Sequence, residues 1–424
     1  MASKFLLALS LTLLVSSALA ERRPSLQLSE EQQCRIQRLT AAQPTQRIES
    51  EGGVTEIWDE RQEQFQCAGV VAMRNTIRAN GLSLPNYHPT PRLVFIERGQ
   101  GFIGITFPGC AETYHAHTTQ RTRERSEEEE RRQGSGKDMH QKVHRIRRGD
   151  IVATRGPLAF YLAGGVPQRG QQEQARQKFQ NIFRAFDANL MAEAFNVPQE
   201  IVQRMQTEEE ERGLIVIARE RMSFITPEEQ QQEWGRQSAA DNGMEESFCT
   251  MKIRTNIENR READMYSRQA GKLNVVDRNK LPILKYMDLS AEKGNLYPNA
   301  LLSPDWAMHG HTIVYVTKGD AKIEIVGHNG QALMNDRVNQ GDMFVVPQYY
   351  TSSCRAGNNG FEWVAFKTTG WPMRNPVAGY TSVMRAMPLQ VLTNIYQISP
   401  NQAQGLKMNR GSQSFLLSPG GRQY

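Results

Sequence analysis

Two pairs of histidines are the residues whose spacing could support metal chemistry. His115 and His117 form one His-x-His pair, and His309 and His311 form the other. Imidazoles combined with a carboxylate bind Fe, Mn or Cu, but neither pair has a glutamate at the spacing that would complete such a site. We therefore expect surface or loop histidines. Only the second pair leaves room for an adventitious surface metal.

Other catalytic signatures are missing from the sequence. It contains no Gly-x-Ser-x-Gly motif, no glycine-rich phosphate loop and no Cys-x-x-Cys pair. The cysteines number five, so at least one must stay free or pair between chains; they are Cys34, Cys67, Cys110, Cys249 and Cys354.

The N-terminal segment has the pattern of a secretory signal peptide. Lys4 provides a positive charge, residues 5–15 are apolar, and small residues follow up to Ala20. The apolar run is too short to span a bilayer. We expect cleavage between Ala20 and Glu21, which makes disulfides possible in the mature chain. The alternative is an N-terminal membrane anchor, which we disfavour because no second apolar stretch of spanning length follows.

Length and charge suggest two unequal halves. The mature chain is long enough for two domains. Residues 243–424 carry 20 Lys and Arg against 14 Asp and Glu, whereas residues 21–242 carry 30 against 31. The basic residues of the C-terminal part are spread singly, without runs or interleaved aromatics, so no nucleic-acid partner is expected.

Two polar segments lack the apolar stripe of a packed helix. Residues 121–137, within a longer charged stretch at 111–142, predict a solvated loop. Residues 226–242 predict a connector between the two halves. The expected organisation is a signal peptide at 1–20, an N-terminal domain at 21–225, the connector, and a C-terminal domain at 243–424.

Much of the remaining sequence is typical of β-strands. Residues 92–107 and residues 312–326 each contain two runs of β-branched and aromatic residues separated by a glycine. This pattern predicts a β-hairpin in each half.

The two halves are related by an internal repeat. Gly99 matches Gly319 at a separation of 220 residues, and Gly149 matches Gly341 at a separation of 192 residues. The first copy is therefore longer between its two glycines, and the charged loop accounts for much of the difference. Such a repeat predicts the same barrel twice.

A helical segment follows each copy. Apolar residues recur at helical spacing in residues 183–206 and in residues 387–407, with Pro198 and Pro400 at similar places. Helices with unpartnered apolar faces in a secreted protein often pack against another copy of the same chain.

Several motifs resemble one family. The stretch from Asn242-Gly243 to Cys249 resembles the processing junction of 11S (legumin-type) seed storage globulins, members of the cupin superfamily. Further resemblance lies in residues 101–110, 281–284, 290–296 and 361–367. The resemblance implies a mainly β fold with two cupin barrels (double-stranded β-helix, or jelly roll), each followed by a small helical extension.

The same resemblance implies how the chain matures. Asparaginyl endopeptidase would cut between Asn242 and Gly243. Cys110 would pair with Cys249 between the resulting chains, and Cys34 with Cys67 within one chain, which leaves Cys354 unpaired. Trimers would become hexamers after the cut, and the destination would be the protein storage vacuole.

Catalytic cupins hold a metal with three histidines and one carboxylate. Matching the repeat glycines places those positions at Asn86, His88, Leu93 and Ala159 in the first barrel, and at Asp305, Ala307, Thr312 and Ser352 in the second. One ligand-type residue in each barrel cannot hold a catalytic metal, so we expect no catalytic residues, no metal and no cofactor.

The expected function is storage of nitrogen, which suits glutamine-rich segments such as residues 168–180. Two alternatives stay open. One is a metal-dependent bicupin oxidase. The other is a sugar- or small-ligand-binding bicupin in which Trp306, Tyr315 and Tyr349 line a barrel.

Overall fold

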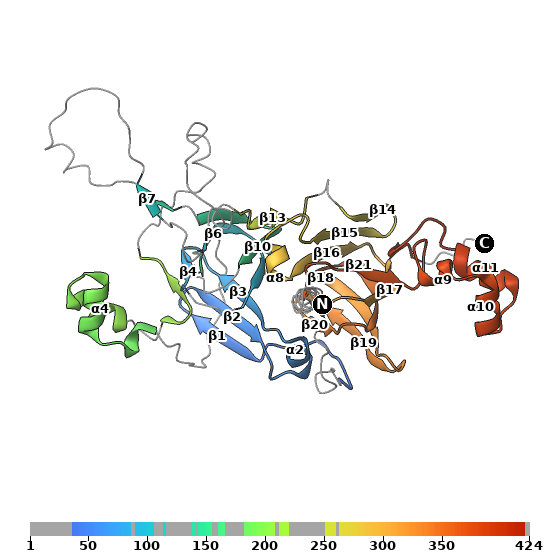
Figure 1. Ribbon diagram of the computed structural model, residues 1–424, viewed down its shortest axis with the longest axis horizontal. Coiled ribbons are helices and arrows are strands. Elements are labelled where there is room, and N and C mark those ends of the chain that lie inside the picture. The colour runs from blue at the N-terminus through green and yellow to red at the C-terminus, as the bar shows by residue number, and fades with distance from the viewer. Residues whose placement is uncertain are drawn as a thin grey trace, which may run out of the picture. The chain divides into compact units, whose positions relative to one another are not determined.

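Antiparallel strands are the main regular elements of the described part of the chain (Figure 1). The computed structural model describes residues 36–85, 90–105, 113–115, 138–140, 143–154, 160–165, 182–207, 212–219, 251–259 and 263–419. The chain divides into the units Met1–Gln37 and Arg38–Tyr424, and the fold reported below is that of the second unit.

In the described residues, the N-terminal half contributes to four antiparallel sheets. They have the orders β1-β2-β3, β12-β4-β11-β6-β9, β13-β10-β5 and β7-β8, of which β13 (Arg254–Asn256) comes from the C-terminal half. Strands β7 and β8 pair Thr113–His115 with Asp138–His140, on either side of the predicted charged loop, whose own residues lie outside the described part. The remaining strands of this half are β1 (Gln46–Ser50), β2 (Gly53–Trp58), β3 (Ala72–Ile77), β4 (Gly81–Ser83), β5 (Arg92–Phe95), β6 (Gln100–Ile105), β9 (Val143–Arg147), β10 (Asp150–Thr154), β11 (Phe160–Gly165) and β12 (Ile215–Ile217).

The C-terminal half forms one ten-stranded sheet. Its main path runs β14-β15-β16-β21-β17-β22, while β18 pairs with β19, β20 and β21. The strands are β14 (Met265–Ser267), β15 (Gly271–Val276), β16 (Ser290–Leu296), β17 (Leu301–Ala307), β18 (Thr312–Val326), β19 (Ala332–Asn339), β20 (Met343–Val346), β21 (Thr351–Lys367), β22 (Arg374–Pro376) and β23 (Leu416–Leu417).

The ladder register confirms the internal repeat. Val94 pairs with Val152, and the residues 220 and 192 positions later, Val314 and Phe344, also pair. The same shifts carry the pair Ile103–His144 onto Ile323–Asp336. The two halves therefore repeat the same strand pairings, as the glycine spacings predicted.

The hairpin prediction was wrong in both halves. Strand β18 is continuous through Gly319 and pairs with β21 along its length. In the first half β5 and β6 pair with different strands and not with each other. Gly319 has a φ of 73°, and a Cβ there would lie 2.1 Å from the Gly360 carbonyl oxygen. The glycine accommodates a bend and a close backbone approach and does not reverse the chain.

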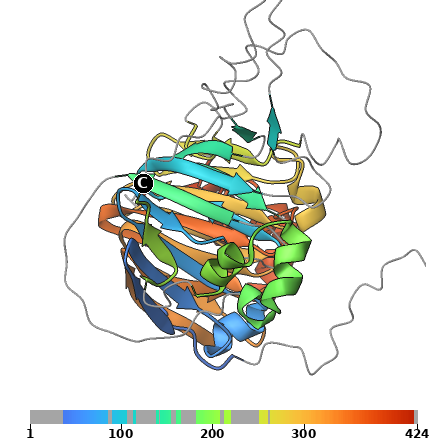
Figure 2. The ribbon, with the colours of Figure 1, turned by 90° about the vertical axis from the view of Figure 1, so that its left-hand side faces the viewer.

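Each barrel is followed by short helices, as predicted. These are η2 (Ile182–Ala185), α4 (Ala188–Phe195) and α5 (Gln199–Gln206), and then α9 (Val383–Ala386), α10 (Leu389–Tyr396) and α11 (Pro400–Met408). Each predicted segment is broken by a residue in the left-handed region, Asn196 or Gln397. Asp187 caps α4, and Ser399 with Gln402 forms a capping box on α11. In Figure 2, where the left-hand side of Figure 1 faces the viewer, α4 and α5 are drawn in green.

Two further short helices in the described part of the chain are α2 (Glu63–Ala68) and α8 (Leu284–Met287). Both contribute buried residues to cores that mix the two halves. In one core Ile103 and Ile151 pack with Ile253 and Leu284. None of the helices in the described part of the chain combines the length and hydropathy needed to cross a bilayer.

Candidate site in the C-terminal barrel

A cavity in the C-terminal barrel contains all four positions that the sequence matched to cupin metal ligands. Asp305 and Ala307 reach it from β17, Thr312 from β18 and Ser352 from β21. The corresponding residues of the first barrel, Asn86, His88 and Ala159, lie outside the described part, and Leu93 packs against a core between the halves.

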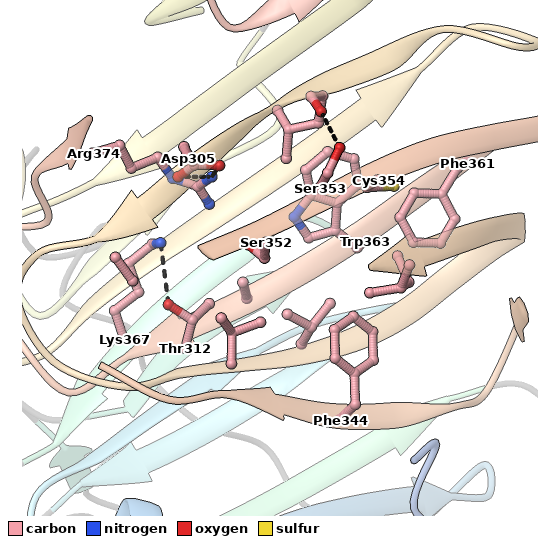
Figure 3. Close-up of a pocket in the computed structure, with 16 residues that line it drawn as sticks. Asp305, Thr312, Phe344, Ser352, Ser353, Cys354, Phe361, Trp363, Lys367 and Arg374 are labelled. Atoms are coloured by element: carbon pink, nitrogen blue, oxygen red, sulfur yellow. Dashed lines mark hydrogen bonds and ion pairs between the residues drawn. The ribbon is translucent and has the colours of Figure 1, made fainter. Parts of the chain in front are cut away.

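The cavity has a polar end and an apolar end (Figure 3). Asp305, Arg374, Lys367 and Thr312 lie together at one end, and Ser352 lies near the middle. The other end is apolar. It includes three aromatic side chains and one thiol, namely Phe344, Phe361, Trp363 and Cys354.

Four charged side chains pair with one another at the polar end. Arg374 donates from Nη1 to both oxygens of Asp305 at 3.0 Å, and from Nη2 to the two oxygens of Glu292 at 2.8 and 2.9 Å. Lys367 Nζ lies 3.3 Å from Glu292 Oε2 and 3.4 Å from Thr312 Oγ1. We call Glu292, Asp305, Lys367 and Arg374 the ion quartet. Its two cations balance its two carboxylates.

The ion quartet is nearly closed to water. The side chains of Glu292, Asp305 and Lys367 are at most 4% exposed, and that of Arg374 is 13% exposed. Trp363 also donates from its indole nitrogen to Glu292 at 3.3 Å. Charges taken out of water at this depth are tolerated only when they are paired and hydrogen-bonded.

Burial and pairing shift the pKa values of the ion quartet in different directions. Burial raises the pKa of Asp305 and lowers that of Lys367. Burial would also raise the pKa of Glu292, but Arg374 and Lys367 hold it below its usual value. Burial opposes the charge of Arg374, yet Asp305 and Glu292 raise its pKa, so the guanidinium stays charged.

The polar side chains of the cavity do not fit a catalytic metal. The one carboxylate that lines the cavity, Asp305, and the carboxylate of Glu292 are both paired with cations from the protein, and no imidazole lines the cavity. His311 lies outside the lining and accepts a hydrogen bond from the Gln348 backbone at 3.3 Å, and burial lowers its pKa. Over the described ranges, no cluster of three His, Cys, Asp or Glu is placed to hold a metal. A redox site of the germin kind needs imidazoles that this barrel does not present.

The aromatic residues suggested for sugar stacking are not the ones that line the cavity. Tyr315 instead lies between the halves, where its hydroxyl accepts from Arg74 at 2.7 Å and donates to Glu97 at 3.4 Å. Tyr349 is 52% exposed, and Trp306 is absent from the lining. None of the three residues lines this cavity, so the alternative of a sugar-binding barrel has no support from them.

Comparison with known proteins assigns the family. The cupin family matches residues 39–203 and 255–404, one stretch in each half. The chain is 69% identical to the 11S globulin seed storage protein 2 of Sesamum indicum over 459 residues, covering 100% of this chain and 99% of the sesame protein. The crystal structure of pumpkin seed globulin superposes with a TM-score of 0.77 at 31% identity, over 92% of this chain and 100% of the pumpkin chain.

The chain belongs to the 11S globulin seed storage proteins of the cupin family. As such a globulin it is a storage protein and not an enzyme. The manganese-containing oxalate decarboxylase of Bacillus subtilis also superposes, with a TM-score of 0.62, but its 11% identity shows only a shared fold.

The cysteines and the processing residues of this 11S globulin are partly visible. Cys67, on α2, is disulfide-bonded. Cys354, on β21, is a buried free thiol whose pKa is raised by burial. The remaining predicted site residues lie outside the described part; they are Ala20, Glu21, Cys34, Cys110, Asn242, Gly243 and Cys249.

Burial makes the Cys354 thiol unreactive in the folded protein, because only an accessible thiolate attacks a disulfide reagent. We expect no reaction with Ellman's reagent at neutral pH in the native protein, and one thiol per chain in denaturant without reductant. The Cys354→Ser variant should show none in either condition. A rapid native reaction would contradict the burial, and more than one thiol after unfolding would contradict the pairings proposed below.

Sequence reasoning missed three of the four ion-quartet residues. Glu292 and Lys367 lie in the stretches 290–296 and 361–367, which were singled out for family resemblance and not for charge pairing, and Arg374 belongs to no motif. One signal was present in β21, where Phe361, Trp363, Ala365 and Lys367 alternate and all line the cavity. A lysine in phase with apolar residues on the inner face of a strand indicates a buried cation that needs a partner.

Proposed function

We propose that this chain is a nitrogen and amino-acid reserve of the seed, laid down in the protein storage vacuole after passage through the endoplasmic reticulum. The observation that carries the proposal is the match to a sesame seed storage globulin along the whole chain. The closed ion quartet agrees with it, because the charged groups at the polar end of the cavity pair with one another and no imidazole lines the cavity.

The reserve role has a direct test. An antibody against the chain should detect it accumulating in maturing seed and disappearing during germination, within membrane-bounded vacuoles in both stages. A constant level through germination would contradict a reserve function.

Maturation is proposed to follow the processing junction. Removal of residues 1–20 exposes Glu21, and asparaginyl endopeptidase cuts between Asn242 and Gly243. Cys110 then joins the two chains through Cys249, while Cys34 is the proposed partner of Cys67. The supporting observations are the junction motif and the disulfide state of Cys67.

The proposed cut predicts an electrophoretic pattern. Protein from mature seed should run as one band without reductant and as two bands with it, with the new N-terminus at Gly243. Asn242→Ala should leave a single band under both conditions, because the peptidase requires the asparagine. Two bands from the Asn242→Ala variant would place the cut elsewhere.

Assembly with further copies is proposed to use the terminal helices. Phe186 and Leu190, beside and on α4, are 52% and 57% exposed, and Ile395 and Leu406, on α10 and α11, are 61% and 52% exposed. Apolar surface of this extent on a storage protein is best covered by another copy of the chain. We propose trimers held by these helices, which join as hexamers after the cut, an assembly typical of the family.

A further inference from the structure

The segment that follows the proposed cut does not stay with its own barrel. Strand β13 (Arg254–Asn256) belongs to the C-terminal chain but pairs with β10 of the N-terminal half (Figure 1). Backbone hydrogen bonds extend the pairing at both ends. Ala153 donates to the Ile253 carbonyl and Ile257 donates to the Gly149 carbonyl, each at 2.8 Å.

The N-terminal half makes the reciprocal contact. Leu39 donates to the Leu333 carbonyl at 2.8 Å, and Ala42 donates to the Met343 carbonyl at 2.6 Å. Met343 lies on β20, which is the repeat equivalent of β10. Each half therefore adds a segment to the equivalent strand of the other half.

Buried side chains fix both exchanged segments. Asp150, 1% exposed, accepts from Arg254 Nη1 at 3.1 Å and from Asn256 Nδ2 at 2.8 Å. On the other side, Trp58 donates to the Ala42 carbonyl at 2.9 Å, and Gln64 accepts from the Val345 backbone at 3.1 Å. Removing only one partner of a charged or buried hydrogen bond is costly, because the other partner is left buried without a hydrogen bond.

Two apolar cores enclose the exchange. One joins Ile151 and Val152 to Ile253 and Ile257, and the other joins Trp58 and Phe65 to Met343 and Val345. The contact between the halves thus has the character of a domain core and not of a surface patch.

We infer that the two chains produced by the cut form an obligate non-covalent pair, held by the reciprocal strand exchange, and that the disulfide between them is dispensable for cohesion. The inference rests on the proposed cut. The partner of each chain is the other half of the same precursor, and the cut removes a covalent link without opening any of the pairings described above.

The test is reduction of the cut protein under native conditions. The mature protein is treated with a phosphine reductant, alkylated, and analysed by size-exclusion chromatography and native mass spectrometry. We expect the two chains to co-elute with no loss of the pair, although reducing gels of the same fraction show two bands. Release of separate chains by reductant alone would overturn the inference.

A second arm separates this inference from the proposed processing. A recognition sequence for a site-specific protease is placed in the connector, residues 226–242, and the purified full chain is cut there and reduced. If native seed protein proves uncut at Asn242, the processing proposal fails, but this cut protein still reports on cohesion.

Substitutions in β13 test whether this strand holds the two chains together. In the cut and reduced protein, held in urea at a concentration where the parent releases its C-terminal chain slowly but measurably, Arg254→Ala with Asn256→Ala leaves buried Asp150 without either side-chain donor and should speed that release about tenfold or more. The matched control is Lys280→Ala, which removes an ion pair with Asp264 inside the C-terminal chain at 2.6 Å. Equal release rates for the two variants would show that β13 does not hold the chains together.

Discussion

Arg374→Ala should lower the free energy of unfolding by about 3–5 kcal/mol, because it leaves the buried carboxylates of Asp305 and Glu292 without their shared guanidinium. Removing one member of a buried ion cluster strands the opposite charges in a medium that cannot solvate them. The measurement is the urea midpoint followed by tryptophan fluorescence, to which Trp363 beside the ion quartet contributes.

The matched control is Arg337→Ala. Arg337 also pairs with a carboxylate, donating to Asp320 at 2.8 Å, but its side chain is 67% exposed. Exposed pairs contribute at most about 1 kcal/mol. Equal midpoints for the two variants would mean that water or neighbouring groups compensate the carboxylates, and that the ion quartet is not a structural requirement of the barrel.

The ion quartet gives the C-terminal barrel a different polar centre from that of a metal cupin. Asp305 occupies one of the positions matched to metal ligands, but its partner is a cation that the chain itself supplies from β22. The other three matched positions are Ala307, Thr312 and Ser352, which offer no imidazole. The lack of imidazoles at these positions could be read from the sequence. The pairing of Asp305 with Arg374 could not, because β22 follows β21 through a turn that carries no motif.

The repeat was predictable because glycine spacing reports backbone geometry directly. Gly99 and Gly319 each have positive φ, and Gly149 and Gly341 do as well, so a substitution at any of them would strain the backbone. The direction of the chain at Gly319 was not predictable from the same signal, since a positive φ serves a bend as well as a reversal. Pairing partners distant in sequence decide between the two.

The strand exchange escaped sequence reasoning for a related reason. Residues 254–256 follow the predicted connector and were assigned to the C-terminal domain by order along the chain. Their pairing with β10 depends on Asp150 and on apolar neighbours from the other half. Local patterns indicate that a segment is a strand, but they do not say which sheet it joins.

Ile395→Glu should reduce the uncut mature chain from an oligomer to single copies. Ile395 is 61% exposed on α10, where an apolar side chain gains from contact with another copy. A carboxylate forced into that contact costs on the order of several kcal/mol, which corresponds to roughly a hundredfold or greater loss of affinity. The measurement is molar mass by light scattering, with circular dichroism to confirm that the barrels remain folded.

The control adds the same charge elsewhere. Gln331→Glu lies on the exposed turn between β18 and β19 and should leave the molar mass unchanged. An Ile395→Glu protein that keeps the mass of the parent would show that α10 and α11 do not contact a neighbouring copy.

In a closed ring of three copies, each contact joins two different surfaces, one from each neighbouring copy, in a head-to-tail arrangement. Leu190→Glu on α4, 57% exposed, should then give single copies just as Ile395→Glu does. Mixing the two variants should restore one contact, between the intact α4 face of one and the intact α10 face of the other, and produce a one-to-one pair. If each helix pair instead met its own equivalent, either variant alone would stop at a dimer and the mixture would form no mixed species.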